Sequence, residues 1–272
     1  GDGKTYAIWY VNGSKRLYVY KDLGDGNGYT KIVDDFPFFS QNAAQVKLNY
    51  DGTKMLLAAR RDLQSYGGAN DGGLAIVLEY DPTKTTTSNS YLYSPGSLPE
   101  SYGPVGWKVM GNHITGPNNG HLADITYNEH ISLSDDGLTF AFGVYDSYEN
   151  AHVYTWNGSA WGLKGSIIAE PSNVQDFGRY LSMSGDGNSI IVGSANDKHW
   201  VFKWSGTTWE QQGGYIDVEG GGEQRGQAIN TDGTVIAVGD QNGAGRIKIF
   251  DRNPSETNVY HVGWTQRGNT IT

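Results

Sequence analysis

Side chains that could bind a ligand or a cation gather in polar segments that separate apolar runs of this chain. The candidate binding residues are Tyr10, Arg60, Asp62, Tyr145, Asp146, Asn196, Asp197, Asp240 and Asn242. Tyr, Asn, Asp and Arg are the residue types that recognition surfaces carried on loops tend to use. Asp146, Asp240 and Asn242 also offer oxygen ligands of the kind that Ca²⁺ takes. We therefore expect a ligand-binding surface with no cofactor, and the alternative is a Ca²⁺ ion held by one of these three residues.

Motifs for catalysis are missing from the sequence. The six histidines show neither H-x-x-x-H nor H-E-x-x-H spacing, no G-x-S-x-G occurs, and the chain has no cysteine. Gly24, Gly26 and Gly28 form a G-x-G-x-G, but no helix is expected after them, so they predict no phosphate site. We expect no catalytic residue and a protein that is not an enzyme. Two carboxylates from different parts of a repeat protein could still form a glycosidase pair.

Composition narrows the classes of partner and fold. The 272 residues include 39 Gly, 18 Tyr and 8 Trp, and the net charge is −9. This acidity disfavours a nucleic-acid partner, which needs a basic face. No apolar run of about 18 residues occurs, so we expect no membrane insertion. Abundant Gly, Tyr and Trp favour many short strands joined by tight turns.

An Asp-Gly pair recurs between two apolar segments. The pairs are Asp2-Gly3, Asp51-Gly52, Asp136-Gly137, Asp186-Gly187 and Asp232-Gly233. Asp and Gly tolerate the positive φ of tight hairpin turns, and an Asp side chain can accept a hydrogen bond from the backbone two residues on. A strand precedes the last four pairs, so the pattern predicts four hairpins whose turns are capped by Asp51, Asp136, Asp186 and Asp232.

Two further strands follow each of these hairpins. The last one carries an aromatic residue, then Gly four residues later, then Ile, at Trp107, Trp161, Trp209 and Trp264. Because these tryptophans repeat in register, we expect them to pack between neighbouring repeats. Sugar stacking on exposed Trp or Tyr is the alternative role.

Four strands per unit and a period near 50 residues predict an all-β protein, a β-propeller of about five four-stranded blades. The chain is expected to form one domain over residues 1–272. The approximate blades are 1–45, 46–130 with an insertion at 82–104, 131–180, 181–226 and 227–272. The first unit begins at its Asp-Gly turn and lacks a first strand. Either five blades close into a ring that includes a three-stranded blade, or the chain is a five-blade excerpt of a larger propeller.

The repeat unit, S-x-S-x-D-G-x-x-x-A-V-G followed by V-Y-x-W-x-G-x-x-W-x-x-x-G-x-x-I, resembles the FG-GAP type repeat of integrin-α-like propellers. The Phe-Gly pair stands once in its expected place, at Phe177-Gly178. The resemblance implies that the connections between second and third strands lie on the ligand-binding face. It also implies an extracellular protein. The calcium loop of such repeats is not carried over, because the turns here hold too few oxygen ligands.

From these patterns we expect a non-enzymatic propeller that acts in recognition, adhesion or structural assembly, outside the cell or on a cell or virion surface. Its partner would be a protein or a glycan, and self-assembly is included. One alternative is a carbohydrate-binding propeller lectin, and another is a hydrolase or lyase that acts on polysaccharide. Asn12 and Asn157 begin N-x-S sequons and are the glycosylation candidates of a glycoprotein.

Overall fold

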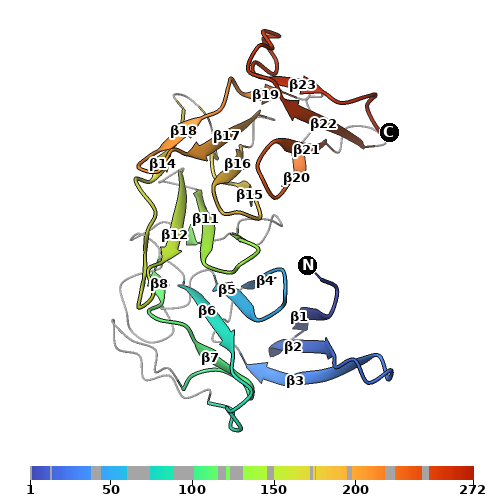
Figure 1. Cartoon of the computed structure of the whole chain (residues 1–272), viewed down its shortest axis with the longest axis vertical. Coiled ribbons are helices and arrows are strands. Elements are labelled where there is room, and N and C mark those ends of the chain that lie inside the picture. Colours follow the sequence, from blue (N-terminus) through green and yellow to red (C-terminus); the bar gives the residue numbers. More distant parts are fainter. Residues whose placement is uncertain are drawn as a thin grey trace.

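The computed structural model consists of antiparallel β-sheets (Figure 1). It describes residues 2–12, 14–37, 44–59, 74–88, 101–115, 121–122, 131–145, 150–171, 174, 176–194, 198–217, 224–240 and 245–272. No segment within these ranges forms a helix, so none of them offers a helical membrane span. The all-β propeller predicted from the sequence is confirmed.

Five sheets, which we call blades 1 to 5 in chain order, make up the described part of the molecule. Blade 1 has the strand order β1 (Thr5–Asn12), β2 (Ser14–Asp22) and β3 (Tyr29–Pro37). Blade 2 has the order β4 (Ala44–Leu48), β5 (Lys54–Ala59), β6 (Leu74–Tyr80) and β7 (Trp107–Val109), and β8 (Ile114–Thr115) pairs with β6.

Blades 3 to 5 repeat the order of blade 2. Blade 3 holds β10 (Ile131–Leu133), β11 (Thr139–Tyr145), β12 (Asn150–Trp156) and β13 (Trp161–Leu163), with β14 (Ile168–Ala169) on β12 and β9 (His121–Leu122) on β11. Blade 4 holds β15 (Tyr180–Met183), β16 (Ser189–Gly193), β17 (Lys198–Trp204) and β18 (Trp209–Gln211), with β19 (Ile216–Asp217) on β17. Blade 5 holds β20 (Gln224–Ile229), β21 (Val235–Asp240), β22 (Arg246–Arg252) and β23 (Trp264–Gln266).

The outer part of blades 2 to 4 differs from the single fourth strand that the sequence predicts. In blade 3 it consists of two short strands, β13 and β14, which pair with opposite ends of β12. Gly165 lies between them at φ 75°, a left-handed conformation that interrupts a strand. The glycine four residues after the Trp is therefore a break in the strand.

The Asp-Gly turns lie together at one end of the blades, which we call the turn face. Asp186 Oδ1 accepts a hydrogen bond from the Asn188 amide at 2.9 Å, and Gly187 has φ 68°. Asp51, Asp136 and Asp232 accept the corresponding bond at 2.8 to 3.0 Å. The predicted capping role of the aspartates is confirmed.

Backbone hydrogen bonds join each turn to the next one around the molecule. The donors and acceptors are Asp2 to Tyr50 at 2.8 Å, Tyr50 to Asp135 at 3.0 Å, Asp135 to Gly185 at 2.8 Å and Asp186 to Thr231 at 3.0 Å. Each bond runs from one blade to its successor, so the blades are held in sequence order.

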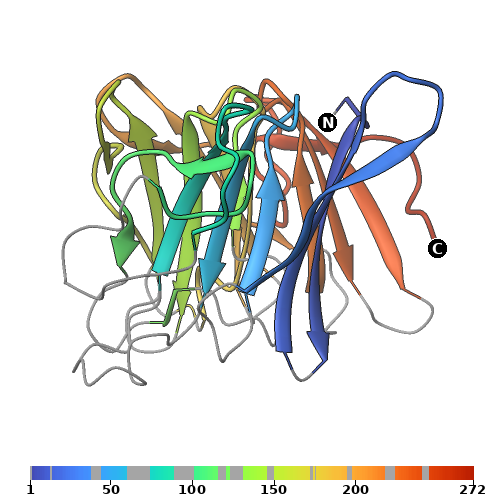
Figure 2. The same ribbon diagram turned by 90° about the horizontal axis from the view of Figure 1, so that it is seen from below.

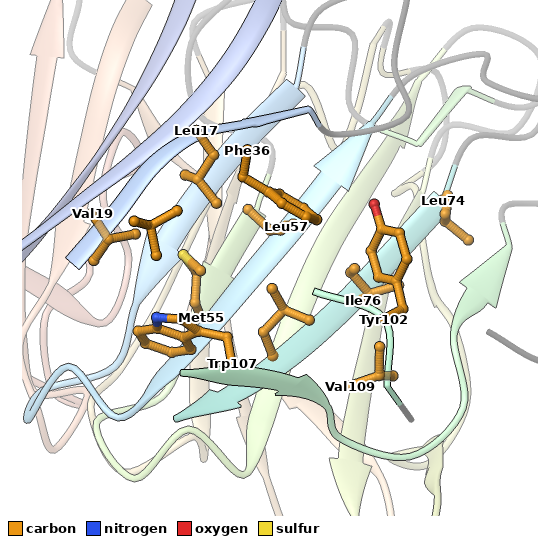
Figure 3. Packing of buried hydrophobic residues seen from close by; sticks show 12 residues of the cluster. Leu17, Val19, Phe36, Met55, Leu57, Leu74, Ile76, Tyr102, Trp107 and Val109 are labelled. Carbon is orange, nitrogen blue, oxygen red and sulfur yellow. The ribbon is translucent and has the colours of Figure 1, made fainter. Parts of the chain in front are cut away.

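Apolar side chains fill the space between neighbouring blades. Figure 3 shows one such layer, in which Leu17, Val19 and Phe36 of blade 1 lie against Met55 and Leu57 of blade 2. Tyr102, from the insertion predicted at 82–104, is fully buried in the same layer. Both faces of blades 2 to 4 are covered in this way, because successive residues of a strand point to opposite faces.

The repeated tryptophans link one blade to the previous one, as the sequence predicts. The indole Nε1 of Trp161 donates to Met110 O at 2.7 Å, that of Trp209 to Lys164 O at 2.8 Å, and that of Trp264 to Gln212 O at 2.8 Å. In each case the acceptor stands three residues after the Trp of the preceding blade. Trp107 is fully buried against three-stranded blade 1, and its Nε1 has no acceptor among the described residues.

The five blades form an open arc in Figure 1, with the first strand of each four-stranded blade toward the middle. The described parts of neighbouring blades touch all along this arc, and blade 5 has no comparable contact with blade 1. Both chain ends lie on the open side (Figures 1 and 2). Blade 1 has three strands, as expected from the missing first strand.

Candidate functional site

The face opposite the turns, which we call the loop face, is where second strands end and third strands begin. Three of the predicted binding residues lie in strands: Tyr10 near the end of β1, Tyr145 at the end of β11 and Asp240 at the end of β21. Figure 2 shows the strands running from the turn face to this opposite end. The remaining predicted residues, Arg60, Asp62, Asp146, Asn196, Asp197 and Asn242, lie outside the described residues, so their binding role stays a prediction.

A strained turn lies on the loop face where blade 3 leads into blade 4. Asp176 has φ 58°, and it is the one residue other than glycine with positive φ in the described ranges. The Arg179 amide donates to Asp176 O at 3.1 Å, which closes the turn. Such a conformation costs about 1–2 kcal/mol for a residue with a Cβ, so surrounding contacts must hold it.

Two glycines clamp this turn between blades 3 and 4. The Gly178 amide donates to Gly193 O in β16 at 3.2 Å. A Cβ on Gly178 would lie 2.5 Å from Asn150 O, and a Cβ on Gly143 would lie 1.7 Å from Gly178 O. The backbone of residues 176–179 is therefore pressed against β11 and β12, and Phe177 is fully buried beneath it.

The turn presents a carboxylate and a guanidinium side by side. Arg179 Nη1 lies 3.2 Å from Asp176 Oδ2, and the Arg179 and Asp176 side chains are 10% and 23% exposed. The guanidinium carbon also lies 5.7 Å from the ring centre of Tyr180, a distance at which a cation and a ring attract. We call Asp176 and Arg179 the acid–guanidinium pair. It offers a partly exposed base beside a fixed positive charge.

A buried histidine lies next to this turn. His199 of β17 is fully buried, and its Nδ1 is 2.5 Å from Gln227 Oε1 in blade 5. Because Gln227 Nε2 donates to Ile191 O at 2.9 Å, its Oε1 is an acceptor, and His199 carries its proton on Nδ1. Burial lowers the pKa of His199 to about 4, so the ring is neutral at neutral pH. Gly193 lies against both His199 and Gln227, which places these groups beside the clamped turn.

His152 of β12 is a second buried histidine. Its ring stacks on Phe142 at 5.1 Å between ring centres, and burial lowers its pKa to about 4. Its Nε2 has no hydrogen-bond partner in the described part of the chain. With pKa values this low, both histidines are poor general bases near pH 7, and His199 joins blade 4 to blade 5 through its contact with Gln227.

No three His, Asp or Glu side chains come together as a metal site within the described ranges. The side chain of Asp240 is not described, and Asp146 and Asn242 lie outside the described residues, so the Ca²⁺ alternative stays a prediction.

Asn157 is exposed, and its Oδ1 accepts hydrogen bonds from the Ser159 and Ala160 amides at 2.9 Å. The other sequon residue, Asn12, ends β1. Glycosylation at both stays a prediction.

The repeated tryptophans do not offer a sugar-binding surface. Trp107, Trp161 and Trp264 are at most 4% exposed, and Trp209 is partly buried and hydrogen-bonded to blade 3. Their rings pack in the interfaces between blades. A lectin site on these residues is therefore not supported.

Sequence reasoning missed the acid–guanidinium pair and the His199–Gln227 contact. The pair flanks Phe177-Gly178, which the sequence marks only as a family signature. The useful signal was that Asp-Phe-Gly-Arg occurs in one unit alone, which sets this segment apart from the repeat.

Comparisons with known proteins show which solved structures have a similar fold. No protein-family model matches the chain, and no curated protein matches it in sequence. Among solved structures, the Pseudomonas aeruginosa periplasmic gluconolactonase PpgL is similar with a TM-score of 0.59 at 16% identity, over 99% of this chain and 68% of that one. KlAtg21, solved with a coiled coil of AgAtg16, gives 0.58 at 12% identity, over 92% of this chain and 63% of that one. The dihydro-heme d1 dehydrogenase NirN gives 0.51 at 12% identity, over 97% of this chain and 43% of that one.

These neighbours share the β-propeller fold and do not single out the FG-GAP type. They overturn our expectation of a non-enzymatic recognition or adhesion protein, because a gluconolactonase and a dehydrogenase are among them. The expectation rested on missing catalytic motifs, and that argument fails because the same fold is found in enzymes and fold alone does not determine function. The low identities show the fold alone and no substrate. The chain spans less than two thirds of KlAtg21.

Proposed function

We propose that this propeller is a hydrolase acting on carbohydrate, with its reaction centre at the acid–guanidinium pair on the loop face. The observation that carries the proposal is Asp176, held at positive φ by a clamp of glycines and paired with nearly buried Arg179. Backbone strain that the surroundings maintain concentrates at functional sites. The carbohydrate class is supported by the fold likeness to a gluconolactonase.

The pair suits hydrolysis of a sugar lactone or a carbohydrate ester. Asp176 would take a proton from water as the water attacks the carbonyl carbon, and Arg179 would stabilise the negative charge that develops on the carbonyl oxygen. The bond between the carbonyl carbon and the leaving oxygen then breaks, and the alkoxide takes the proton that Asp176 had accepted from water. Glycoside hydrolysis needs a second carboxyl about 5–10 Å away. The acid–guanidinium pair supplies one carboxyl beside one positive charge, which suits the ester or lactone.

The test is a turnover assay of the purified chain against sugar lactones, esterified polysaccharides and plain polysaccharides. Asp176→Asn keeps a side chain that tolerates positive φ and removes the base, so we expect activity to fall about 100-fold or more with the melting temperature retained. Asp251→Asn is the matched control, because it breaks the exposed Asp251–Arg267 pair on blade 5. Full activity in folded Asp176→Asn, or no turnover of any substrate, would contradict the proposal.

The family and the location belong to the same proposal. Phe177 is fully buried and Gly178 has no room for a Cβ, which supports an FG-GAP type repeat at this position. An extracellular location would suit an enzyme that meets a polymeric carbohydrate. Secretion of the tagged chain, with glycan attached at Asn157, is the measurement that checks it.

A further inference from the structure

We propose that the outer face of blade 5 is a docking surface for one further blade of the same four-stranded repeat. We call this surface the terminal face. It consists of Val235, Ala237, Ile249, Arg267 O, Gly268 and Ile271. The argument compares these positions with the same positions in blades 2 to 4, where the next blade is present.

Three apolar positions of each blade meet the following blade. One lies in the second strand, its partner lies in the third strand, and an Ile follows the outer strand. The triplets are Leu56, Val77 and Ile114 in blade 2, Ala141, Val153 and Ile168 in blade 3, and Ile191, Val201 and Ile216 in blade 4. All nine are at most 8% exposed.

Blade 5 has the same triplet without a cover. Ala237 pairs with Ile249 across β21 and β22, and Ile271 forms a bridge with Ile247. Ala237 and Ile249 are partly exposed, and Ile271 is 54% exposed. An outward surface under no selection for contact would not need to keep three apolar residues in register.

A glycine with positive φ, which we call the seat glycine, accompanies the triplet in each of blades 2 to 4 and lies against the next blade. Gly111, Gly165 and Gly213 have φ of 74°, 75° and 84°, and a Cβ on any of them would lie within 2.4 Å of the next blade. The atoms met are ring carbons of Trp156 and Trp204 and the carbonyl oxygen of Val262. Gly268 repeats the position and the conformation with φ 68°, and nothing lies within 4 Å of its ideal Cβ. Blade 5 therefore has its seat glycine in the same conformation, with open space where the next blade lies in blades 2 to 4.

The polar contact of the interface is also prepared. The carbonyl oxygens of Met110, Lys164 and Gln212 each accept the indole Nε1 of the next blade's Trp. Arg267 stands at the same place, three residues after Trp264. A further blade with Trp at the start of its outer strand would therefore donate its indole N–H to Arg267 O.

The turn face gives the same result. The glycine of each Asp-Gly pair in blades 2 to 5 packs against the preceding blade, where it meets the residue that stands two places after that blade's own Asp-Gly glycine. Gly52 packs in this way against Thr5, Gly187 against Thr139 and Gly233 against Ser189. The corresponding residue of blade 5 is Val235, and no described glycine sits on it. Apolar, turn and indole contacts all continue an interface that the molecule already uses between its blades. These contacts specify a blade of this repeat as the occupant.

The experiment extends the full chain by a second copy of residues 218–272, joined after Thr272. Ile271 occupies the position of Ile216, so the copy enters in the register in which blade 5 follows blade 4. We expect one cooperative thermal transition, a rise in Tm of roughly 5–10 °C, and slower amide exchange in β22.

Substitutions in the original copy identify the surface. Ile249→Lys is expected to change the Tm of the 272-residue chain by less than about 2 °C, because its side chain is already partly exposed. In the extended chain the same substitution should abolish the gain, because it buries a charge. Val259→Lys, at a side chain that is 69% exposed and outside the terminal face, is the matched control and should leave the gain intact. Trp264→Phe in the added copy removes the indole N–H and should reduce the gain.

Two outcomes would overturn the proposal. One is an added copy that stays sensitive to protease and leaves Tm unchanged. The other is a concentration-dependent dimer of the 272-residue chain, seen by light scattering, that Ile249→Lys dissociates. That result would make a second copy of the chain the occupant of this face.

Discussion

The side of blade 4 that faces blade 5 and the side of blade 5 that faces outward carry the same pattern in different surroundings. Ile191, Val201 and Ile216 lie against blade 5 and are at most 1% exposed. Ala237, Ile249 and Ile271 hold the same positions and are exposed in part or in large part. The difference teaches that burial here comes from the neighbour, while the pattern itself is a property of each unit.

The face of blade 1 that points away from blade 2 is also exposed, but it is covered in a different way. Tyr6 and Ile8 occupy positions where blade 2 has buried Met55 and Leu57, and they are 39% and 43% exposed. The Tyr6 ring stacks on Tyr20 at 4.9 Å and meets Tyr29 edge-on at 4.8 Å between ring centres. This face covers itself with tyrosines, whose hydroxyl groups tolerate water.

The largest expected effect compares Phe140 with Tyr6, which hold the same position in blades 3 and 1. Phe140→Ala should lower the free energy of unfolding by about 3–5 kcal/mol, because it leaves a cavity against Trp161 and Tyr154. Tyr6→Ala should cost about 1 kcal/mol, since it loses ring contacts on an exposed face. Urea denaturation of both variants measures this. Equal losses would mean that the outer face of blade 1 is as well covered as an inner one.

Next comes the pair Ile216 and Ile271. Ile216 is fully buried, and Ile216→Ala should cost about 2–4 kcal/mol. Ile271→Ala should stay within about 0.5 kcal/mol, because the side chain is already mostly in water. Thermal melts of the two variants in parallel test the comparison, and a large loss for Ile271→Ala would show that the terminal face is covered in solution.

Alanine at the seat glycines separates backbone strain from contact. Gly268→Ala should cost about 1 kcal/mol, because its φ of 68° disfavours a Cβ and nothing else opposes one. Gly111→Ala should cost about 2 kcal/mol more, since its Cβ would lie 2.3 Å from the Trp156 ring. The two values come from chemical denaturation, and a costlier Gly268→Ala would reverse the assignment of covered and open seats.

The smallest effect uses the histidine in a covered interface. The pKa of His199 is lowered by burial to about 4 from 6.5, so the unfolded chain binds more protons between these pH values, and stability falls as pH falls through that window. Between pH 7 and pH 5.5 the loss should be about 1 kcal/mol. His199→Gln should remove this part of the pH dependence. A stability curve whose slope is unchanged in His199→Gln would refute it.

Much of the fold follows from local chemistry that the sequence displays directly. Asp-Gly turns require particular residues at each hairpin, and Trp161, Trp209 and Trp264 repeat because each makes the same bond to the previous blade. A pattern that recurs can be read from one chain. The division of the fourth strand at Gly165 was missed, because Trp and Ile flank it with no sign of a break other than the glycine itself.

The candidate site was not predictable for the opposite reason. The strain at Asp176 depends on Gly143 approaching Gly178, and the state of His199 depends on Gln227, 28 residues away. Neither contact recurs among the described residues of the other blades, and no local pattern encodes it. Of the predicted loop residues, Tyr145 and Asp240 end strands on the loop face, where Asp176 also lies.

The turn-to-turn bonds from Asp2 to Thr231 and the indole bonds from Trp161, Trp209 and Trp264 involve only adjacent blades. A gene duplication that copied one whole unit would therefore bring its own contacts with it and disturb none of the older ones. A point mutation inside a unit must stay compatible with the contacts to two neighbouring blades. A change in the number of units requires only that one new interface between blades be compatible. Evolution by copy number is thus the less constrained route for this architecture, with diversity left to the connections on the loop face.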